Sequence, residues 1–242
     1  MISLENRVVV VTGASQGIGR AIALGLAKKK AVLFLVARNG SALQEVADIA
    51  RTSSPRVMLQ AADLAVDGAD TEIAESLGQE FGGLDGLVHC AGAFSMGALE
   101  TASVDELDRL YRINVRMPYG LTQSLLPLLK RRKGQIAFVN SSQGMQARAC
   151  VGQFAASQHA LKAIADSLRD EVNVDGIRVL SVYCGRTATP RMEAMYKLEG
   201  REYRPELLLQ AEDVAEAVIN ALVMPLTAEV TNITLRPLIK SY

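Results

Sequence analysis

The sequence lacks an excess of charge of either sign, and it lacks long apolar runs. Its 26 Lys and Arg residues balance 26 Asp and Glu residues over 242 residues, so the formal net charge is zero. A nucleic-acid-binding protein needs excess cationic charge, and a membrane-surface protein needs a basic face or an apolar anchor, so we expect neither kind of partner. The longest apolar runs are strand-sized, well below the ~18 residues of a membrane-spanning helix.

Targeting signals and a cysteine framework are also missing. No long apolar stretch followed by a small-residue cleavage site opens the chain, so we expect no signal peptide. Cys90, Cys150 and Cys184 are odd in number and lack metal-ligand spacing. We therefore expect neither disulfides nor a zinc site, and a reducing, cytoplasmic location.

The composition, 49% hydrophobic and 21% charged, is typical of a globular protein. Strand-like runs alternate with helical stretches, without repeats or a Pro/Ser-rich linker. This alternation predicts an α/β fold, a single Rossmann-type doubly wound parallel sheet with helices on both faces. The seven predicted strands span residues 7–12, 31–37, 56–62, 86–90, 135–141, 177–184 and 230–235. The predicted helices span residues 17–30, 41–52, 70–81, 104–130, 152–174 and 211–223. We expect one domain over residues 1–242, with an inserted lid near 190–205.

A glycine-rich loop joins the first predicted strand to the first predicted helix. It reads Thr12-Gly13-Ala14-Ser15-Gln16-Gly17-Ile18-Gly19. Glycines let the backbone turn tightly and approach a pyrophosphate, whose charge is stabilised by the N–H groups and dipole of the next helix. The strand–loop–helix context favours dinucleotide binding over a merely tight turn.

The spacing of this loop, and five motifs after it, resemble those of the short-chain dehydrogenase/reductase family. The resemblance covers essentially the whole chain. The further matching motifs, in order, are Asp63-Leu64, His89-Cys90-Ala91-Gly92 where the family usually has Asn-Asn-Ala-Gly, Ile113-Asn114-Val115, Asn140-Ser141, and Gly185-Arg186-Thr187-Ala188-Thr189-Pro190. Membership would imply an oxidoreductase with a nicotinamide cofactor and a small-molecule substrate.

The end of the second strand indicates which cofactor to expect. An NAD enzyme usually carries a carboxylate there, but this sequence has Ala37 followed by Arg38. Arg38 can bind a 2′-phosphate and stack on adenine, so we expect NADP(H). The resemblance implies that Asp63 and Leu64 hold the adenine, and that Thr189 and Thr187 reach the nicotinamide carboxamide. The expected cofactor-binding residues are Gly13, Ser15, Gly17, Ile18, Gly19, Arg38, Asp63, Leu64, Ala91, Gly92, Gly185, Thr187 and Thr189.

The catalytic positions depart from the family pattern. The resemblance assigns Asn114 to the proton relay and Ser141 to polarising the carbonyl. The family's Tyr-x-x-x-Lys pair, however, is replaced by Phe154 and Gln158. Phenylalanine has no hydroxyl and glutamine no charge, so neither can perform the lost role. Loss of a positioned general acid removes about 10²–10⁴ in rate, so we expect ordinary hydride transfer to be strongly reduced or to use another proton donor.

Two tyrosines, Tyr183 and Tyr196, are candidates for that donor if either reaches inward. His89 replaces a family asparagine and leaves a polar group near the cofactor, although we expect it to be structural. The expected substrate pocket is mostly apolar, with Arg148 as a binding group for an anionic substituent. Its predicted lining is Phe94, Met96, Met145, Arg148, Met192, Met195 and Tyr196.

Two other functions share this fold. One is a non-redox enzyme on the same scaffold, such as a cyclase, lyase or isomerase. The other is a non-catalytic cofactor-binding subunit. Relatives commonly assemble through the two long helices near residues 104–130 and 152–174, so we expect a homodimer or homotetramer by resemblance. The sequence does not identify the substrate.

Overall fold

A computed structural model describes residues 1–239 of the chain. All seven strands are parallel and form one sheet in the order β3-β2-β1-β4-β5-β6-β7. The strands are β1 (Val8–Thr12), β2 (Val32–Ala37), β3 (Val57–Ala61), β4 (Gly86–His89), β5 (Gln135–Ser141), β6 (Arg178–Cys184) and β7 (Asn232–Leu235). The predicted doubly wound parallel sheet is therefore confirmed.

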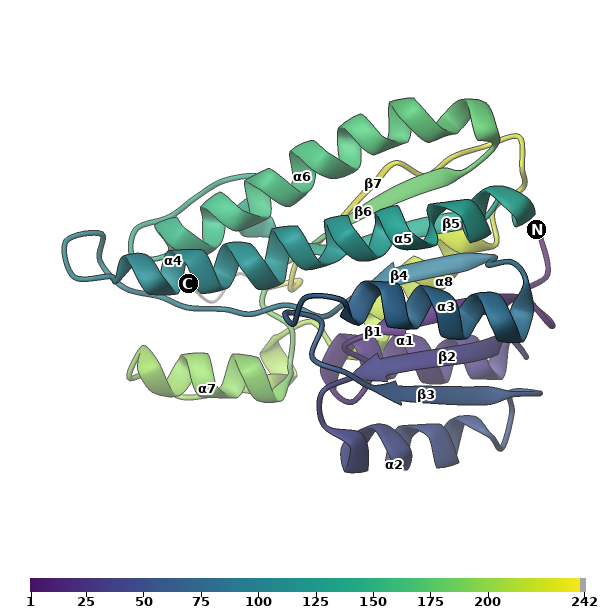
Figure 1. Cartoon of the computed structure of the whole chain (residues 1–242). Helices are drawn as coiled ribbons and strands as arrows, with labels where there is room; N and C mark the ends of the chain where they lie inside the picture. Colours follow the sequence, from purple (N-terminus) through teal and green to yellow (C-terminus); the bar gives the residue numbers. More distant parts are fainter. Residues whose placement is uncertain (240–242) are drawn as a thin grey trace.

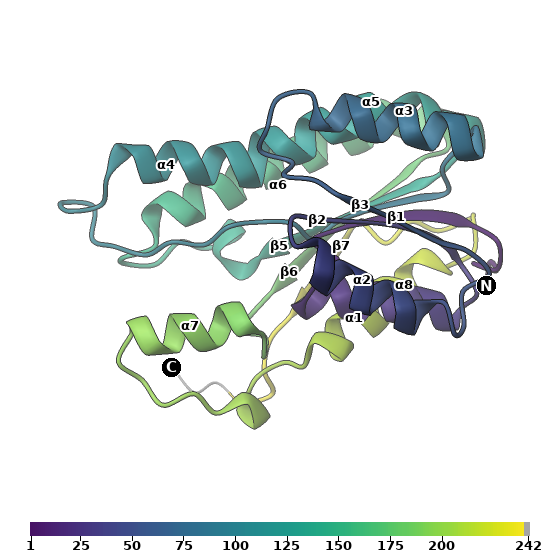
Figure 2. The same cartoon turned by 60° about the horizontal axis from the view of Figure 1, so that its bottom comes forward.

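Helices cover both faces of the sheet (Figures 1 and 2). On one face lie α1 (Gly17–Lys28), α2 (Gly40–Ala50) and α8 (Ala211–Leu222). On the other lie α3 (Ala69–Phe81), α5 (Met117–Arg132) and α6 (Gly152–Val172), with α4 (Val104–Tyr111) continuing the line of α5. The sheet is thus the middle of three layers, as a parallel sheet with crossover helices requires.

The central strand β1 explains why two cores form. Its five residues are all buried, and successive side chains of a strand point to opposite faces. Val9 and Val11 belong to the core under α1, α2 and α8. Val8 and Val10 belong to the core under α3, α5 and α6. A nearly continuous apolar run is what a strand buried on both faces needs.

Two helical segments differ from prediction. The single helix predicted over 104–130 is interrupted by a π-helical turn at Arg112–Arg116, between α4 and α5. The predicted lid contains α7 (Pro190–Leu198), whose first turn is capped by the Thr189 hydroxyl accepting from the Met192 N–H at 3.2 Å. That lid and a single domain over 1–242 otherwise stay predictions. Short 3₁₀ turns lie at Ser142–Gly144, Asn173–Asp175 and Pro205–Leu207.

The order of the strands fixes where a ligand can bind. Connections run one way from β1 to β3 and the other way from β4 onward, so the chain changes direction between β1 and β4. In such sheets the crevice for a ligand opens at the carboxyl ends of the strands, at this change of direction. Helix α7 lies on that side of the molecule, apart from both helical layers (Figure 1). Within residues 1–239, no helix is long and apolar enough to cross a bilayer.

Candidate functional site

A cleft of about 1040 Å³ opens at the carboxyl ends of the strands, between the sheet and α7. It is lined by the loop after β1, by the ends of β2 to β6 and by the first turns of α7. Every residue predicted to bind a cofactor lines this cleft, as do Asn114, Ser141, Phe154 and Gln158. The structure therefore brings the predicted residues together, and their individual roles stay predictions.

The glycine loop is packed too tightly for side chains. Gly13 has φ +64°, and a Cβ on it would lie 2.7 Å from the Ala91 nitrogen. A Cβ on Gly19 would lie 2.2 Å from the Gly13 carbonyl oxygen. The Thr12 hydroxyl accepts from the backbone N–H groups of Cys90 and Ala91 at 3.1 and 3.2 Å, which ties the loop to the end of β4.

This loop suits a dinucleotide phosphate. No side chain caps the first turn of α1, so the N–H groups there remain available to an anion. A pyrophosphate needs a backbone turn without side chains that leads directly into the N-terminus of a helix, and the glycine loop before α1 has this geometry. The residues present therefore fit the cofactor that the sequence predicts.

Arg38 follows directly after β2, is exposed, and lines the cleft. Within residues 1–239 no carboxylate forms an ion pair with it, so its charge is available to a ligand. Asp63, after β3, uses a carboxylate oxygen to accept from the Ala65 N–H at 3.0 Å. The two residues thus border the same end of the cleft, on neighbouring strands.

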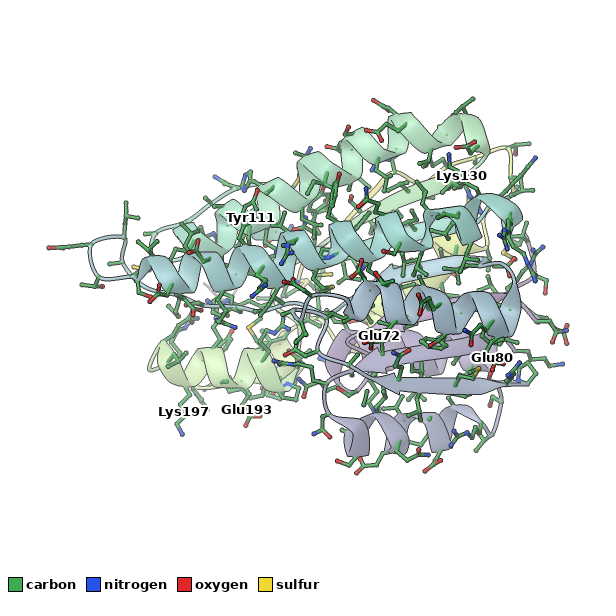
Figure 3. All side chains as sticks on the ribbon, viewed as in Figure 1. Glu72, Glu80, Tyr111, Lys130, Glu193 and Lys197 are labelled. Carbon is green, nitrogen blue, oxygen red and sulfur yellow. The ribbon has the colours of Figure 1, made fainter. Side chains whose placement is uncertain are left out.

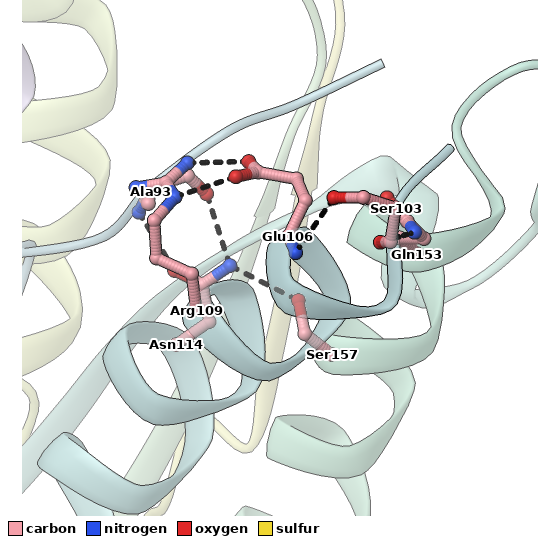
Figure 4. Close-up of polar contacts among 7 residues, drawn as sticks. All are labelled: Ala93, Ser103, Glu106, Arg109, Asn114, Gln153 and Ser157. Atoms are coloured by element: carbon pink, nitrogen blue, oxygen red, sulfur yellow. Dashed lines mark hydrogen bonds and ion pairs between the residues drawn. The ribbon is translucent and has the colours of Figure 1, made fainter. Parts of the chain in front are cut away.

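Asn114 lies in the π-helical turn and is fully engaged in hydrogen bonds (Figure 4). Its amide nitrogen donates to the Ala93 carbonyl at 2.9 Å and to the Ser157 hydroxyl at 3.0 Å. Its oxygen accepts from the Ala93 N–H at 2.7 Å. Asn114 therefore joins the loop after β4 to α6, next to the cleft. In the same view, Arg109 makes a bidentate ion pair with Glu106.

The end of β5 is held in a similar way. Asn140 donates to the Gln158 carbonyl at 3.0 Å and accepts from the Ser141 N–H at 2.6 Å. The Ser141 hydroxyl oxygen accepts from the Gln143 N–H at 3.2 Å. Because a hydroxyl donates as well as accepts, Ser141 keeps its O–H for a ligand in the cleft.

Phe154 and Gln158 lie four residues apart on α6 and both border the cleft. Each is more than nine-tenths buried. The Phe154 ring packs edge-to-face on Phe94, with centroids 4.9 Å apart. Within residues 1–239 the cleft lining holds no tyrosine, lysine or histidine.

The two tyrosines considered as proton donors lie elsewhere. Tyr183 is buried on β6 and does not line the cleft. Tyr196 is buried on α7 and does not line the cleft; the guanidinium groups of Arg186 and Arg201 lie 4.7 and 5.2 Å from its ring centroid. Met192 and Met195 of the same helix line the cleft, whereas Tyr196 is buried against Arg186 and the Tyr203 ring.

The predicted substrate pocket therefore needs correction at two positions. Tyr196 does not line the cleft, nor does Met145, which is 53% exposed. Met145 follows the 3₁₀ turn at Ser142–Gly144, which directs it outward. The other predicted lining residues border the cleft: Phe94, Met96, Arg148, Met192 and Met195.

His89 also lies outside the cleft, contrary to the expectation of a polar group near the cofactor. It stacks on Phe138 with centroids 4.9 Å apart, and its Nε2 is 2.9 Å from the Thr122 hydroxyl. Burial lowers the pKa of His89 to about 3, so the ring is neutral. This agrees with a structural role.

The cysteines are free thiols. Cys90 and Cys184 border the cleft, and burial raises the pKa of Cys184 to about 12 and also raises that of Cys90. Both are protonated at neutral pH and are weak nucleophiles.

Sequence reasoning missed Arg191, which lines the cleft from α7 and donates to the Gly92 carbonyl at 2.6 Å. Its place directly after Thr189-Pro190, at the start of the lid, was the available signal.

Comparison with known proteins shows to which family the chain belongs. The sequence model of the short chain dehydrogenase family matches residues 7–199. The chain belongs to this family. An uncharacterized oxidoreductase of Staphylococcus epidermidis is 31% identical over 238 residues, which cover 98% of this chain and all of the relative.

Solved structures of family members are closely similar. An alcohol dehydrogenase of the archaeon Thermococcus sibiricus, complexed with 5-hydroxy-NADP, has a TM-score of 0.86 at 26% identity, covering 96% of this chain and 97% of that one. A metagenomic short-chain oxidoreductase in complex with NADP has a TM-score of 0.85 at 27% identity, covering 99% and 100%. L-Sorbose reductase from Gluconobacter frateurii, with NADPH and L-sorbose, has a TM-score of 0.88 at 26% identity, covering 97% of each chain.

Proposed function

We propose that this short-chain dehydrogenase binds NADP(H) and acts on a small, mostly apolar carbonyl or alcohol compound. Its hydride transfer is much slower than that of members with the Tyr–Lys pair, or depends on a different proton donor. The glycine loop and the unpaired Arg38 support NADP(H), as do the NADP-bound similar structures. The three free thiols support a reducing, cytoplasmic location.

The proposal of slow hydride transfer rests on the residues that line the cleft. When bound, a reduced nicotinamide supplies a hydride to a carbonyl carbon, and the carbonyl oxygen must then gain a proton. The family's Tyr and Lys positions correspond, by resemblance, to Phe154 and Gln158. The Phe154 ring is packed on Phe94 and has no proton to donate.

The remaining residues retain binding and orienting roles. The Ser141 O–H donates a hydrogen bond to the substrate oxygen, and Asn114 fixes the loop after β4 against α6. The apolar side chains of Phe94, Met96 and Met192 bind the body of the substrate and exclude water. These roles support a site that orients a substrate well but protonates it poorly.

The double reversion Phe154→Tyr with Gln158→Lys tests this proposal. We expect NADPH-dependent reduction of a panel of ketones to rise by about 10²–10⁴ in kcat/KM over the parent, because the acid and the cation that lowers its pKa act together. The readout is the decrease in reduced-nicotinamide absorbance. A fluorescence titration with NADPH, run on parent and variant, separates cofactor binding from chemistry.

The matched control is Phe81→Tyr with Gln79→Lys, which makes the same two changes on α3, outside the cleft. It should leave the rate at the parent level. If the double reversion binds NADPH but reduces no ketone faster than the parent, the two positions do not limit the reaction and the proposal of a missing acid is wrong.

A further inference from the structure

Arg191 bridges the cleft from one wall to the other. It stands in the first turn of α7, and its Nη2 donates to the Gly92 carbonyl, in the loop after β4, at 2.6 Å. Within residues 1–239, no carboxylate forms an ion pair with Arg191. A guanidinium carries five N–H groups, so Arg191 can donate further hydrogen bonds to a ligand besides the one to the Gly92 carbonyl.

The charge balance of the cleft points to an anion. Arg191 and Arg38 line the same cleft without a bonded acid, and desolvation together with the nearby Arg38 charge lowers the pKa of Arg191. The acidic side chains in the described lining are Asp63 and Glu199. Asp63 accepts from a backbone N–H, and Glu199 is paired with Arg186 and Arg201. Two like charges facing one cleft are stabilised when an anion enters it.

The position of Arg191 indicates which part of a dinucleotide it meets. Thr189, which caps α7, lies over the glycine loop: its Cγ2 is 3.1 Å from where a Gly17 Cβ would be. The position of a Cβ on Gly92 lies 3.9 Å from Arg191 Nη1 and 3.3 Å from Asn114 Oδ1. In the sheet, β1 lies between β4 and β2, and Arg38 directly follows β2. The guanidinium therefore lies beside the glycine loop, across it from Arg38.

We infer that Arg191 is a second phosphate-binding arginine, which ties α7 to the Gly92 carbonyl in the free protein and donates to the cofactor pyrophosphate in the complex. This inference rests on the proposed binding of NADP(H). It makes α7 part of the cofactor site and not only a cover for the substrate. Arg38 and Arg191 then have separate roles, the first for the 2′-phosphate and the second for the pyrophosphate.

The variants Arg191→Gln and Arg38→Gln separate these roles. Fluorescence titrations with NADPH and with NADH give the dissociation constants. We expect Arg191→Gln to weaken both cofactors by the same factor, about tenfold or more, since hydrogen bonds to charged groups are among the stronger ones. Arg38→Gln should weaken NADPH much more than NADH. Arg191→Lys keeps the charge and should bind both cofactors more tightly than Arg191→Gln.

Lys197→Gln is the matched control, because Lys197 belongs to the same helix but points away from the body of the molecule (Figure 3) and does not line the cleft. It should leave both dissociation constants unchanged. Unchanged binding by Arg191→Gln would overturn the inference, as would a loss confined to NADPH, which would assign Arg191 to the 2′-phosphate. If the unmodified protein binds neither cofactor, the proposed function fails first and this inference with it.

Discussion

The fold strongly controls the protonation of the His89 side chain. It is 3% exposed, lies between Phe138 and Thr122, and has its pKa lowered to about 3 from an ordinary value near 6.5. The folded protein therefore keeps it neutral over a range in which the unfolded chain binds a proton. Its contribution to stability is present above pH 6.5 and is lost as the pH falls toward 3.

We predict that the free energy of unfolding decreases by about 2 kcal/mol between pH 7 and pH 5 through His89 alone, since each pH unit below 6.5 costs about 1.4 kcal/mol. Urea unfolding of His89→Asn should lack this decrease, although the variant starts from a lower stability. His159, the one other histidine of the chain, is exposed, so His159→Gln should show the same decrease in the free energy of unfolding as the parent. A slope in His89→Asn equal to that of the parent would show that His89 is charged in the folded state.

The sequence could predict which residues meet in the cleft, because the carboxyl ends of parallel strands converge at one edge. Arg38 and Ser141 lie at such strand ends, whereas Asn114 lies in a helical turn and was predicted from the family resemblance. It could not predict the orientation of residues in turns and short helices, where one position changes the direction of a side chain by about 100°. Met145 was misplaced for this reason, and Arg191 was missed. Tyr196 was misplaced because its packing on Arg186 and Tyr203 is a tertiary contact that no local pattern indicates.

At the scale of the helix, α7 is held at its end by a half-buried ion pair. Arg186 makes a bidentate pair with Glu199 at 2.8 and 2.7 Å, and its guanidinium also stacks on the Tyr196 ring. Bidentate pairs with limited solvent exposure are worth more than isolated surface pairs. This contact therefore fixes the orientation in which α7 presents Arg191 and Met192 to the cleft.

We predict that Glu199→Ala lowers the free energy of unfolding by about 1–3 kcal/mol, because it leaves the partly buried Arg186 without its bidentate partner. Hydrogen exchange should become faster in α7 and stay unchanged in β1 and β4. Glu202→Ala removes a pair with Arg204 in which both side chains are more than half exposed, and should leave the free energy of unfolding nearly unchanged. Equal effects of the two substitutions would contradict a specific anchor at Glu199.

The interruption of the predicted helix over 104–130 has a tertiary cause. Apolar periodicity runs through both α4 and α5, so the sequence pattern predicts one helix. In the structure the π-helical turn at Arg112–Arg116 contains Asn114, which bonds to Ala93 and Ser157 on other elements. Those partners are distant in sequence, so no local pattern could indicate the change of helix type. A π turn inside a helix often occurs at a functional site.

At the scale of the whole molecule, the alternation of strands and helices was enough to predict the sheet and both helical layers. Each buried strand needs a helix on either side, and crossover connections between parallel strands are right-handed, so few topologies remain. The predicted strand boundaries agree with the structure within two residues. The shape of the cleft was beyond this reasoning, because residues of α7 line it and α7 belongs to neither helical layer (Figure 2).

We propose that the protein forms a homodimer or homotetramer, because the surface of the α4–α5 line carries exposed apolar side chains. Val104, Tyr111 and Tyr119 are 71%, 48% and 52% exposed. They are spaced by seven and then eight residues, or about two helical turns each, which keeps them on one side of the line. Exposed apolar groups gathered on one side mark an interaction surface more often than scattered ones do.

We predict that light scattering gives a mass of two or four times 26.0 kDa. The double variant Tyr111→Glu with Tyr119→Glu should give 26.0 kDa, because charges placed in an apolar interface are costly to desolvate. Ile49→Glu with Leu226→Glu also replaces two exposed apolar side chains, outside both of these helical segments, and should keep the mass of the parent. A parent that is monomeric would refute the assembly, and a double tyrosine variant with unchanged mass would move the interface away from α4 and α5.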